Sequence, residues 1–197
     1  HAQNGFAILF TVRNQDGGAP WSIVEDVTFV NNIVRHVGGG VNVLGRDDNH
    51  PSEQTRRLEI RNNVFLDVGG AWGSGRLFQL LDGTNNVTIA QNTGLQTGSI
   101  LFGGDHAPHT AFVFQNNIAP HNEHGIIGSS TEPGNQTLAR YFPLTRLEFN
   151  ESGPKGESDK FSIILALHIE GRVSGHVRMS LRQQPGAGPP SVDVLEA

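Results

Sequence analysis

Four short segments of the chain resemble one another, and in each of them apolar residues alternate with polar ones. They read "VTFVNN" (27–32), "LEIRNN" (58–63), "VTIAQN" (87–92) and "FVFQNN" (112–117). Successive side chains of a β-strand point to opposite faces, so we predict a strand in each segment with its two alternating apolar residues facing the core. The apolar pairs are Val27 and Phe29, Leu58 and Ile60, Val87 and Ile89, and Phe112 and Phe114.

The four segments belong to a longer repeat. Their final asparagines lie 31, 29 and 25 residues apart, and a second apolar run follows each segment: "GVNVLG" (40–45), "RLFQLLDG" (76–83), "SILFGG" (99–104) and "GIIGSS" (125–130). The segment "GFAILFTV" (5–12) fits the position of the second run. Connections of unequal length disfavour helical repeats of fixed length and propellers, and they favour a solenoid with two or three short strands per coil.

The asparagine that ends each segment has a structural interpretation. In stacked coils equivalent residues lie on top of one another, so Asn32, Asn63, Asn92 and Asn117 would form a column. Asparagine tolerates the left-handed backbone of a turn, and its side-chain amide can bond to the coils above and below. We therefore predict an asparagine ladder where every coil turns.

The chain changes character after the last repeat. The segment "TRLEFN" (145–150) imitates the earlier strands and is expected to open a further coil, whereas "ESGPKGESDK" (151–160) resembles a charged linker. Residues 161–181 alternate again, with a break from Gly171 to Gly175, and predict a β-hairpin that could cap the solenoid. The final residues are expected to be disordered. The predicted domains are 1–150, the solenoid, and 151–197, the hairpin or cap with its tail.

The repeated segments and the second runs of the type "GGGVNVLG" resemble the right-handed parallel β-helix repeat proteins of the pectin-lyase-like superfamily, especially bacterial ones, over about residues 5–135. The resemblance implies an all-β fold, a right-handed parallel β-helix of about four to five coils. It also implies a secreted or cell-surface protein, whose export signal would precede this C-terminal part. The superfamily includes lyases, hydrolases, isomerases, tailspikes and adhesins, and its local catalytic signatures, such as Gly-His-Gly or Arg-Ile-Lys, do not follow Asp47 and Asp48 here.

Composition narrows the partners. A net charge of -5 with 14 Lys and Arg residues provides no basic stripe, so we expect no nucleic-acid partner. The chain contains no cysteine, which excludes disulfides and thiol chemistry, and no apolar run long enough to span a membrane. We expect a monomer whose partner is a polysaccharide.

Candidate chemistry lies in the loops after the second apolar runs. Aligning these runs places Asp47, Asp82 and Asp105 on consecutive coils, roughly 5 Å apart from neighbour to neighbour. Such carboxylates could bind calcium, with Asp47 and Asp105 as ligands, or act as the acid and base of glycosidic cleavage. Arg46 and His106 are added as catalytic candidates, and together with His50 they could accept a proton or hold a uronate carboxylate. The predicted substrate-binding residues are Trp72, His50, His109 and Arg76.

Simpler interpretations compete with each of these roles. Asp in a glycine-rich loop is often a turn former, and Asp82 precedes Gly83 as in an ordinary turn. Trp21 and Trp72 could stack on sugar rings or pack over a loop. His121, Glu123 and His124 resemble a metal cluster but can equally be solvated. Two functions therefore remain open: a polysaccharide lyase or glycoside hydrolase acting on an extended glycan, and a non-catalytic surface, carbohydrate-binding or adhesion module.

Overall fold

The computed structural model describes residues 5–148, 151–153, 161–169, 172–182 and 191–195. The chain divides into two units, His1–Ser152 and Gly153–Ala197. The division falls close to residue 150, where the repeats were expected to end. Each unit is described by itself.

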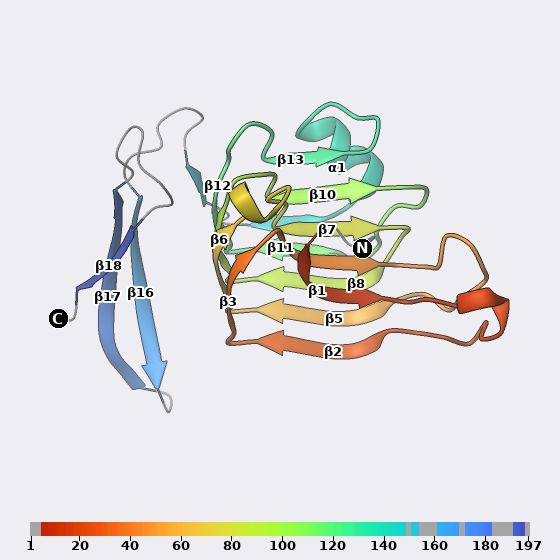
Figure 1. Cartoon of the computed structure of the whole chain (residues 1–197), viewed down its shortest axis with the longest axis horizontal. Coiled ribbons are helices and arrows are strands. Elements are labelled where there is room, and N and C mark those ends of the chain that lie inside the picture. The colour runs from red at the N-terminus through yellow and green to blue at the C-terminus, as the bar shows by residue number, and fades with distance from the viewer. Residues whose placement is uncertain (1–4, 149–150, 154–160, 170–171, 183–190, 196–197) are drawn as a thin grey trace. The chain divides into compact units, whose positions relative to one another are not determined.

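The first unit is a parallel β-solenoid of about four turns, built from three sheets of five strands (Figure 1). Sheet A contains β1 (Phe6–Thr11), β4 (Gly39–Leu44), β7 (Phe78–Leu81), β10 (Leu101–Gly104) and β13 (Ile126–Gly128). Sheet B contains β2 (Glu25–Val30), β5 (Arg56–Arg61), β8 (Asn85–Ala90), β11 (Val113–Gln115) and β14 (Arg146–Glu148). Sheet C contains β3 (Ile33–Val37), β6 (Val64–Val68), β9 (Thr93–Gln96), β12 (Ile118–Pro120) and β15 (Glu151–Gly153).

The predicted alternation places the core between these sheets. Ile60, Ile89 and Phe114 stand in register on neighbouring strands of sheet B, and all three are buried. Phe29 also faces this core, as predicted, but it is only partly buried because β2 is the edge strand of sheet B. Its ring packs against Phe10 of β1, with centroids 6.2 Å apart.

The asparagine ladder is present and connects successive coils. Asn63 Nδ2 donates to Asn92 Oδ1 at 3.0 Å, and Asn92 Nδ2 donates to Asn117 Oδ1 at 3.0 Å. The same oxygens accept the backbone amides of Asn63 and Asn92, at 3.1 and 3.0 Å. The Nδ2 atom of each of these amides also donates a hydrogen bond to a strand carbonyl of the preceding coil, as Asn92 does to Ile60 O at 3.0 Å. These buried polar groups are therefore satisfied by one another.

The turn itself belongs to the residue before the ladder. Asn31, Asn62, Gln91 and Asn116 have φ angles of 61°, 55°, 56° and 55°, which is the left-handed region that asparagine tolerates better than most residues. The sequence interpretation assigned the turn and the ladder to the same asparagine. The structure divides them between two neighbouring positions, so the turn column accepts a glutamine whereas the ladder column is asparagine in every coil.

A short helix that the sequence did not predict closes one end of the core. Helix α1 (Asn135–Tyr141) packs against β13 and β10 (Figure 1). Tyr141 and the following Phe142 are buried, and they lie so close to Gly103 that a Cβ atom there would meet both side chains at 2.7 Å. The ring of Phe142 also lies 5.0 Å from that of Phe112. Aromatic packing thus covers the last coil within the first unit.

The second unit contains the predicted hairpin. Strands β16 (Phe161–Ile169) and β17 (Arg172–Arg182) pair antiparallel, and β18 (Ser191–Leu195) joins β17 as a third strand in the segment expected to be disordered. The rest of that tail, 183–190 and 196–197, lies outside the described residues, as does most of the expected linker at 154–160. Capping of the solenoid by this hairpin stays a prediction.

Core burial gives a first test of the register. Replacing Ile60 by Ala should lower the free energy of unfolding by about 2 to 5 kcal/mol, because the cavity lies between two coils that cannot close over it. Phe29→Ala should have a smaller effect than Ile60→Ala, and exposed Thr28→Ala should stay within about 0.5 kcal/mol of wild type. Urea unfolding measures all three, and an equal loss at Thr28 and Ile60 would contradict the register.

The ladder gives a second test. Asn92→Ala removes the acceptor of two donors on Asn63 and the donor to Ile60 O. Buried polar groups left without partners are expensive, so we expect a loss of about 2 to 4 kcal/mol in urea unfolding. The neighbouring Gln91→Asn is the control and should be neutral or slightly stabilising, because asparagine favours the left-handed region. A ladder variant as stable as this control would show that the amide column contributes nothing.

Candidate functional site

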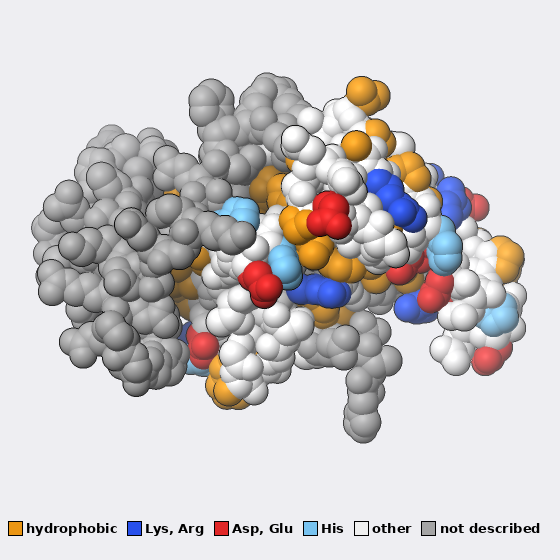
Figure 2. Space-filling view, turned by 90° about the horizontal axis from the view of Figure 1, so that it is seen from above, with side chains coloured by type: hydrophobic (Ala, Val, Ile, Leu, Met, Phe, Trp, Pro, Cys, Tyr) orange, Lys and Arg blue, Asp and Glu red, His pale blue; other side chains and the backbone are white. Residues whose placement is uncertain are grey.

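The strands of sheet A end at one side of the solenoid, and the loops that follow them gather there (Figure 1). We call this side the loop edge and define it by residues 12–20, 45–55, 82–84 and 105–110. It carries Arg13 after β1, Asp47 and Asp48 after β4, Asp82 after β7, and Asp105 and His106 after β10. Acidic, arginine and histidine side chains lie close together toward the right of Figure 2, which is the side of the loop edge.

The register of sheet A places two of the three predicted carboxylates in one column. Leu44 pairs with Leu81, and Leu81 with Gly104, so the next column consists of Gly45, Asp82 and Asp105. Asp47 lies on the same flank, as predicted, but the alignment that placed it level with Asp82 and Asp105 does not hold. A side chain at position 45 has no room, since its Cβ would lie 2.3 Å from Asp82 O. Asp47 lies two residues further along its loop.

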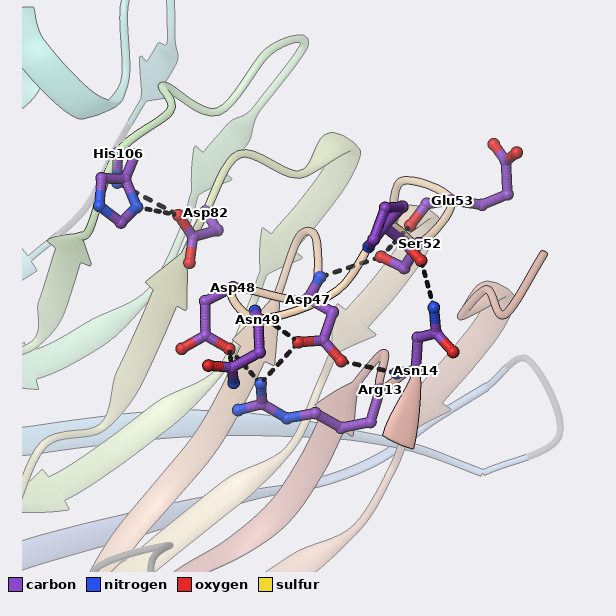
Figure 3. Close-up of polar contacts among 10 residues, drawn as sticks. Arg13, Asn14, Asp47, Asp48, Asn49, Ser52, Glu53, Asp82 and His106 are labelled. Carbon is purple, nitrogen blue, oxygen red and sulfur yellow. Dashed lines mark hydrogen bonds and ion pairs between the residues drawn. The ribbon is translucent and has the colours of Figure 1, made fainter. Parts of the chain in front are cut away.

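Asp47 fastens two loops to each other (Figure 3). Its Oδ2 accepts the backbone amide of Asn14 at 2.6 Å, and its Oδ1 accepts that of Asn49 at 2.9 Å. Arg13 lies 3.4 Å from Oδ1 and also pairs with Asp48. The amide hydrogen bonds, from Asn14 first, lower the pKa of Asp47 to about 2. Asp47 is thus an ionised acceptor that orders the loops after β1 and β4.

Arg46 and His50 lie on the same loop as Asp47. Arg46 is exposed, and its Nη1 donates a hydrogen bond of 3.2 Å to Ser52 O. His50 lies beside Gly17 of the neighbouring loop, where a Cβ atom would be 3.3 Å from its Nδ1. Both side chains are on the surface, and among the described contacts neither one reaches Asp82 or Asp105.

Asp82 and His106 form the second group of the loop edge (Figure 3). Asp82 Oδ1 lies 2.9 Å from His106 Nδ1 and accepts the backbone amide of His106 at 3.2 Å. The aspartate side chain is 8% exposed and the histidine side chain 86%. The hydrogen bond that His106 donates to Asp82 raises the pKa of His106 above its ordinary value. The second oxygen of Asp82, Oδ2, is buried and has no hydrogen-bond partner among the described residues.

Asp105 neighbours this pair and has an electrostatic environment opposite to that of Asp47. Asp105 is an exposed residue, but partial desolvation of its carboxyl and then the negative charge of Asp82 raise its pKa, against a lowering effect of His106. The loop edge therefore contains a strongly acidic carboxyl at Asp47 and a more basic carboxylate at Asp105. Separation of pKa values between groups of one kind is characteristic of sites that transfer protons, although structural ion pairs produce it too.

Two of the predicted substrate-binding residues, Arg76 and Trp72, lie elsewhere in the solenoid. Arg76 is half-buried on the outer face of sheet A, and its guanidinium lies 3.8 Å from the ring centroid of Phe102. Its Nη1 donates a hydrogen bond of 2.6 Å to Gln79 Oε1. Burial lowers the pKa of Arg76. Trp72 lies in the short helix η2 (Gly70–Trp72) between sheets C and A, with its side chain hydrogen-bonded to Asp67.

His109 lies in the interior. It is 0% exposed, and its Nδ1 accepts the backbone amide of Thr84 at 3.0 Å. Its ring stacks on Phe142 with centroids 5.0 Å apart, and burial lowers its pKa to about 4. The imidazole is therefore a neutral core residue at neutral pH, in contact with the aromatic closure of the last coil and not with the surface of the loop edge.

Calcium binding stays a prediction. Within the described ranges, no group of three or more Asp, Glu or His side chains is arranged to hold a metal ion. Both oxygens of Asp47 already accept backbone amides, so a cation there would have to compete with the bonds that order the loop.

The sequence did not point to two residues of the loop edge, Arg13 and Asn14. Arg13 pairs with two aspartates, and Asn14 is buried, with Nδ2 donating to Pro51 O at 2.6 Å. The sequence contained a signal for both residues. The segment "GFAILFTV" fits the second apolar run of a coil, so the residues after it occupy the same kind of loop as Asp47.

Comparison of the chain with family models, with curated proteins and with solved structures gives no match. Membership of the pectin-lyase-like superfamily therefore stays a prediction from the repeated segments, whereas the parallel solenoid is observed. Within the described residues, no helix combines the length and the apolar character that crossing a membrane requires.

The lowered pKa of Asp47 predicts an acid-sensitive loop edge. The carboxylate contributes stability above its ordinary pKa of 3.8, and this contribution is lost as the pH falls from about 4 through about 2. Asp47→Asn, which keeps the size but gives a poor acceptor for two amides, should lower stability at pH 6 by roughly 1 to 3 kcal/mol and flatten the pH dependence between 4 and 2. Urea unfolding across this range measures both, and parallel curves for the two proteins would refute the assignment.

Proposed function

We propose that the protein binds an extended glycan at the loop edge and cleaves it by proton transfer, with His106 and Asp105 as the catalytic pair. The observation that carries the proposal is the arrangement of His106: an exposed imidazole oriented by a buried carboxylate, Asp82, next to a second carboxylate of raised pKa. A carboxylate that fixes one ring nitrogen leaves the other nitrogen available for proton transfer.

The directions of the pKa shifts assign the roles. The raised pKa of His106 favours its imidazolium, which can donate a proton to the leaving oxygen of the scissile bond. The raised pKa of Asp105 makes its carboxylate a stronger base. This base accepts a proton either from an attacking water, giving hydrolysis, or from the carbon next to a uronate carboxylate, giving elimination. In this scheme the histidine is the donor, the reverse of the role that the sequence suggested.

The remaining expectations about the protein belong to the same proposal. The resemblance of the repeated segments to bacterial pectin-lyase-like proteins supports an exported location, secreted or at the cell surface, and a polysaccharide partner. Action as a monomer is part of the same proposal. The ion pair of Arg13 with Asp48 provides a cation that a uronate carboxylate could share.

A second candidate is a glycan-binding module without turnover. The specific observation in its favour is that Asp47, whose pKa is lowered, is fully engaged in ordering loops. In that case the loop edge would be a rigid binding surface, and Asp105 and His106 would bond to sugar hydroxyls without transferring a proton during a reaction.

Substitution of the proposed catalytic pair, His106 and Asp105, tests the proton-transfer mechanism. His106→Ala and Asp105→Asn should each lower the rate of glycan cleavage by about 10² to 10⁴, because each removes one proton-transfer group. The melting temperature should change little for His106→Ala, since that side chain is exposed. Asp82→Asn should weaken activity less and shift the acid limb of the pH profile, since Asp82 acts through His106.

Cleavage is measured as new reducing ends on a panel of neutral glycans and polyuronates, with ultraviolet absorbance distinguishing unsaturated ends from hydrolytic products. His124→Ala is the matched control, because His124 also faces a carboxylate, Glu123, at 3.7 Å but lies outside the loop edge. Wild-type protein that cleaves none of the panel, or a His106→Ala variant as active as His124→Ala, would rule out the proposed mechanism.

A further inference from the structure

A second cluster lies at the opposite ends of the sheet A strands, where sheet C turns into sheet A. It consists of His36, Asp67 and Trp72, from β3, β6 and η2. Asp67 Oδ2 lies 2.7 Å from His36 Nδ1 and accepts the indole Nε1–H of Trp72 at 2.9 Å. The imidazole and indole rings are 5.9 Å apart and tilted by 53°. We call these three residues the tryptophan corner.

The loop that carries Trp72 is fixed to the coils on both sides. Gly69 and Gly75 lie against Thr97 of the next coil so closely that a Cβ on either would be 2.1 or 2.3 Å from Thr97 Oγ1. The backbone amide of Gly70 donates to this oxygen at 3.0 Å, and that of Gly75 donates to Gly38 O of the previous coil at 2.8 Å. Positive φ angles of 98° and 57° at Gly69 and Gly70 make the turn.

The result is an indole that is exposed and yet held in place. Trp72 is 54% exposed, although tryptophan is on average one of the more buried residues. Its one polar atom is already bonded within the protein, so what the side chain offers to a ligand is its apolar ring surface. A ligand that fits has a flat apolar face and a polar rim, and His36 and Asp67 lie beside the indole to meet that rim. A pyranose ring has this chemistry.

We propose that the tryptophan corner is a sugar-binding subsite, in which a pyranose ring of a glycan stacks on Trp72 and its hydroxyls contact His36 and Asp67. The identity of the ligand as a glycan rests on the proposed function, but binding here requires none of the proton transfer assigned to His106. Because the indole is already oriented by Asp67, little conformational entropy is lost on binding. Trp72 is the contact residue, and Asp67 is a positioning residue.

The corner and the loop edge lie at opposite ends of β7 (Figure 1). Ten residues separate Trp72 from Asp82, so the distance between them is at most about 33 Å of extended chain. A glycan that occupies both sites would cross the outer face of sheet A, where Arg76 covers Phe102. The corner would then hold a part of the substrate that is remote from the cleaved bond.

The test is affinity electrophoresis of the full chain through gels that contain galactomannan, hydroxyethylcellulose, polygalacturonate or alginate. At least one polymer should retard the wild type, and Trp72→Ala should weaken that binding at least tenfold. Trp21→Ala is the matched control, because Trp21 is 71% exposed but has no side-chain hydrogen bond or ring contact among the described residues. Unchanged retardation of Trp72→Ala, or no retardation of the wild type by any polymer, overturns the inference.

A second measurement separates loss of contact from loss of fold. In a Trp21→Phe background Trp72 is the sole tryptophan of the chain, so its emission should shift to the blue on addition of the retarding polymer. Asp67→Ala in the same background should lower the fluorescence anisotropy of Trp72 and weaken binding, while the melting temperature stays close to that of the background protein. An emission spectrum insensitive to the polymer overturns the subsite.

The two proposals fail in different ways. A His106→Ala variant that is retarded like the wild type but cleaves nothing supports both. A wild type that is retarded through Trp72 but cleaves no polymer refutes the catalytic proposal alone. Cleavage by a protein whose Trp72→Ala variant is retarded like the wild type refutes the subsite alone.

Discussion

The hydrogen bonds between one coil and the next are the constraint on which the rest of the molecule depends. A parallel strand can satisfy its backbone groups only through its neighbours above and below, so every coil has to repeat the register of the last. At the turn from sheet B to sheet C the regular hydrogen bonds between parallel strands are interrupted. There the side-chain amides of the asparagine column form the hydrogen bonds between coils. One Oδ1 accepts both a backbone and a side-chain donor of the preceding coil, which makes the column difficult to replace by any other residue type.

The sequence repeats at the corner where asparagines connect the coils, whereas the connections elsewhere differ in length. The corner that contains Asn63 and Asn92 has no loop between its strands, whereas the connections that leave sheet A vary in length from coil to coil. Charged and aromatic side chains can therefore be introduced after β1, β4, β7 and β10 without disturbing the core. The fold in this way concentrates chemical variation at the two ends of sheet A, whereas the turn between sheets B and C is repeated from coil to coil.

The sequence predicted the solenoid, the inward-facing pairs and the asparagine ladder, because each of these is written several times and the repeats can be aligned with one another. It failed where a feature occurs once. Helix α1 has a single short segment and no repeat, and the burial of His109 follows from the docking of Phe142, which is distant in sequence. The displacement of Asp47 from the aspartate column arose because Gly45, which the crowded strand end requires, occupies the aligned position.

The same residue type has three different states at the loop edge, and local geometry decides between them. Asp47 receives two backbone amides and is held ionised, Asp82 is buried against an imidazole, and Asp105 is exposed but partly desolvated and close to a like charge. A sequence motif cannot distinguish these states, since all three residues follow a strand of sheet A. Asp47 and Asp82 each accept a backbone amide from a neighbouring loop. Asp105 differs from Asp47 because the long loop after β4 folds back on the loop after β1, whereas among the described hydrogen bonds the short loop after β7 donates no amide to Asp105. Loop length, the most variable property of the repeat, is therefore what separates a structural carboxylate from one available for chemistry.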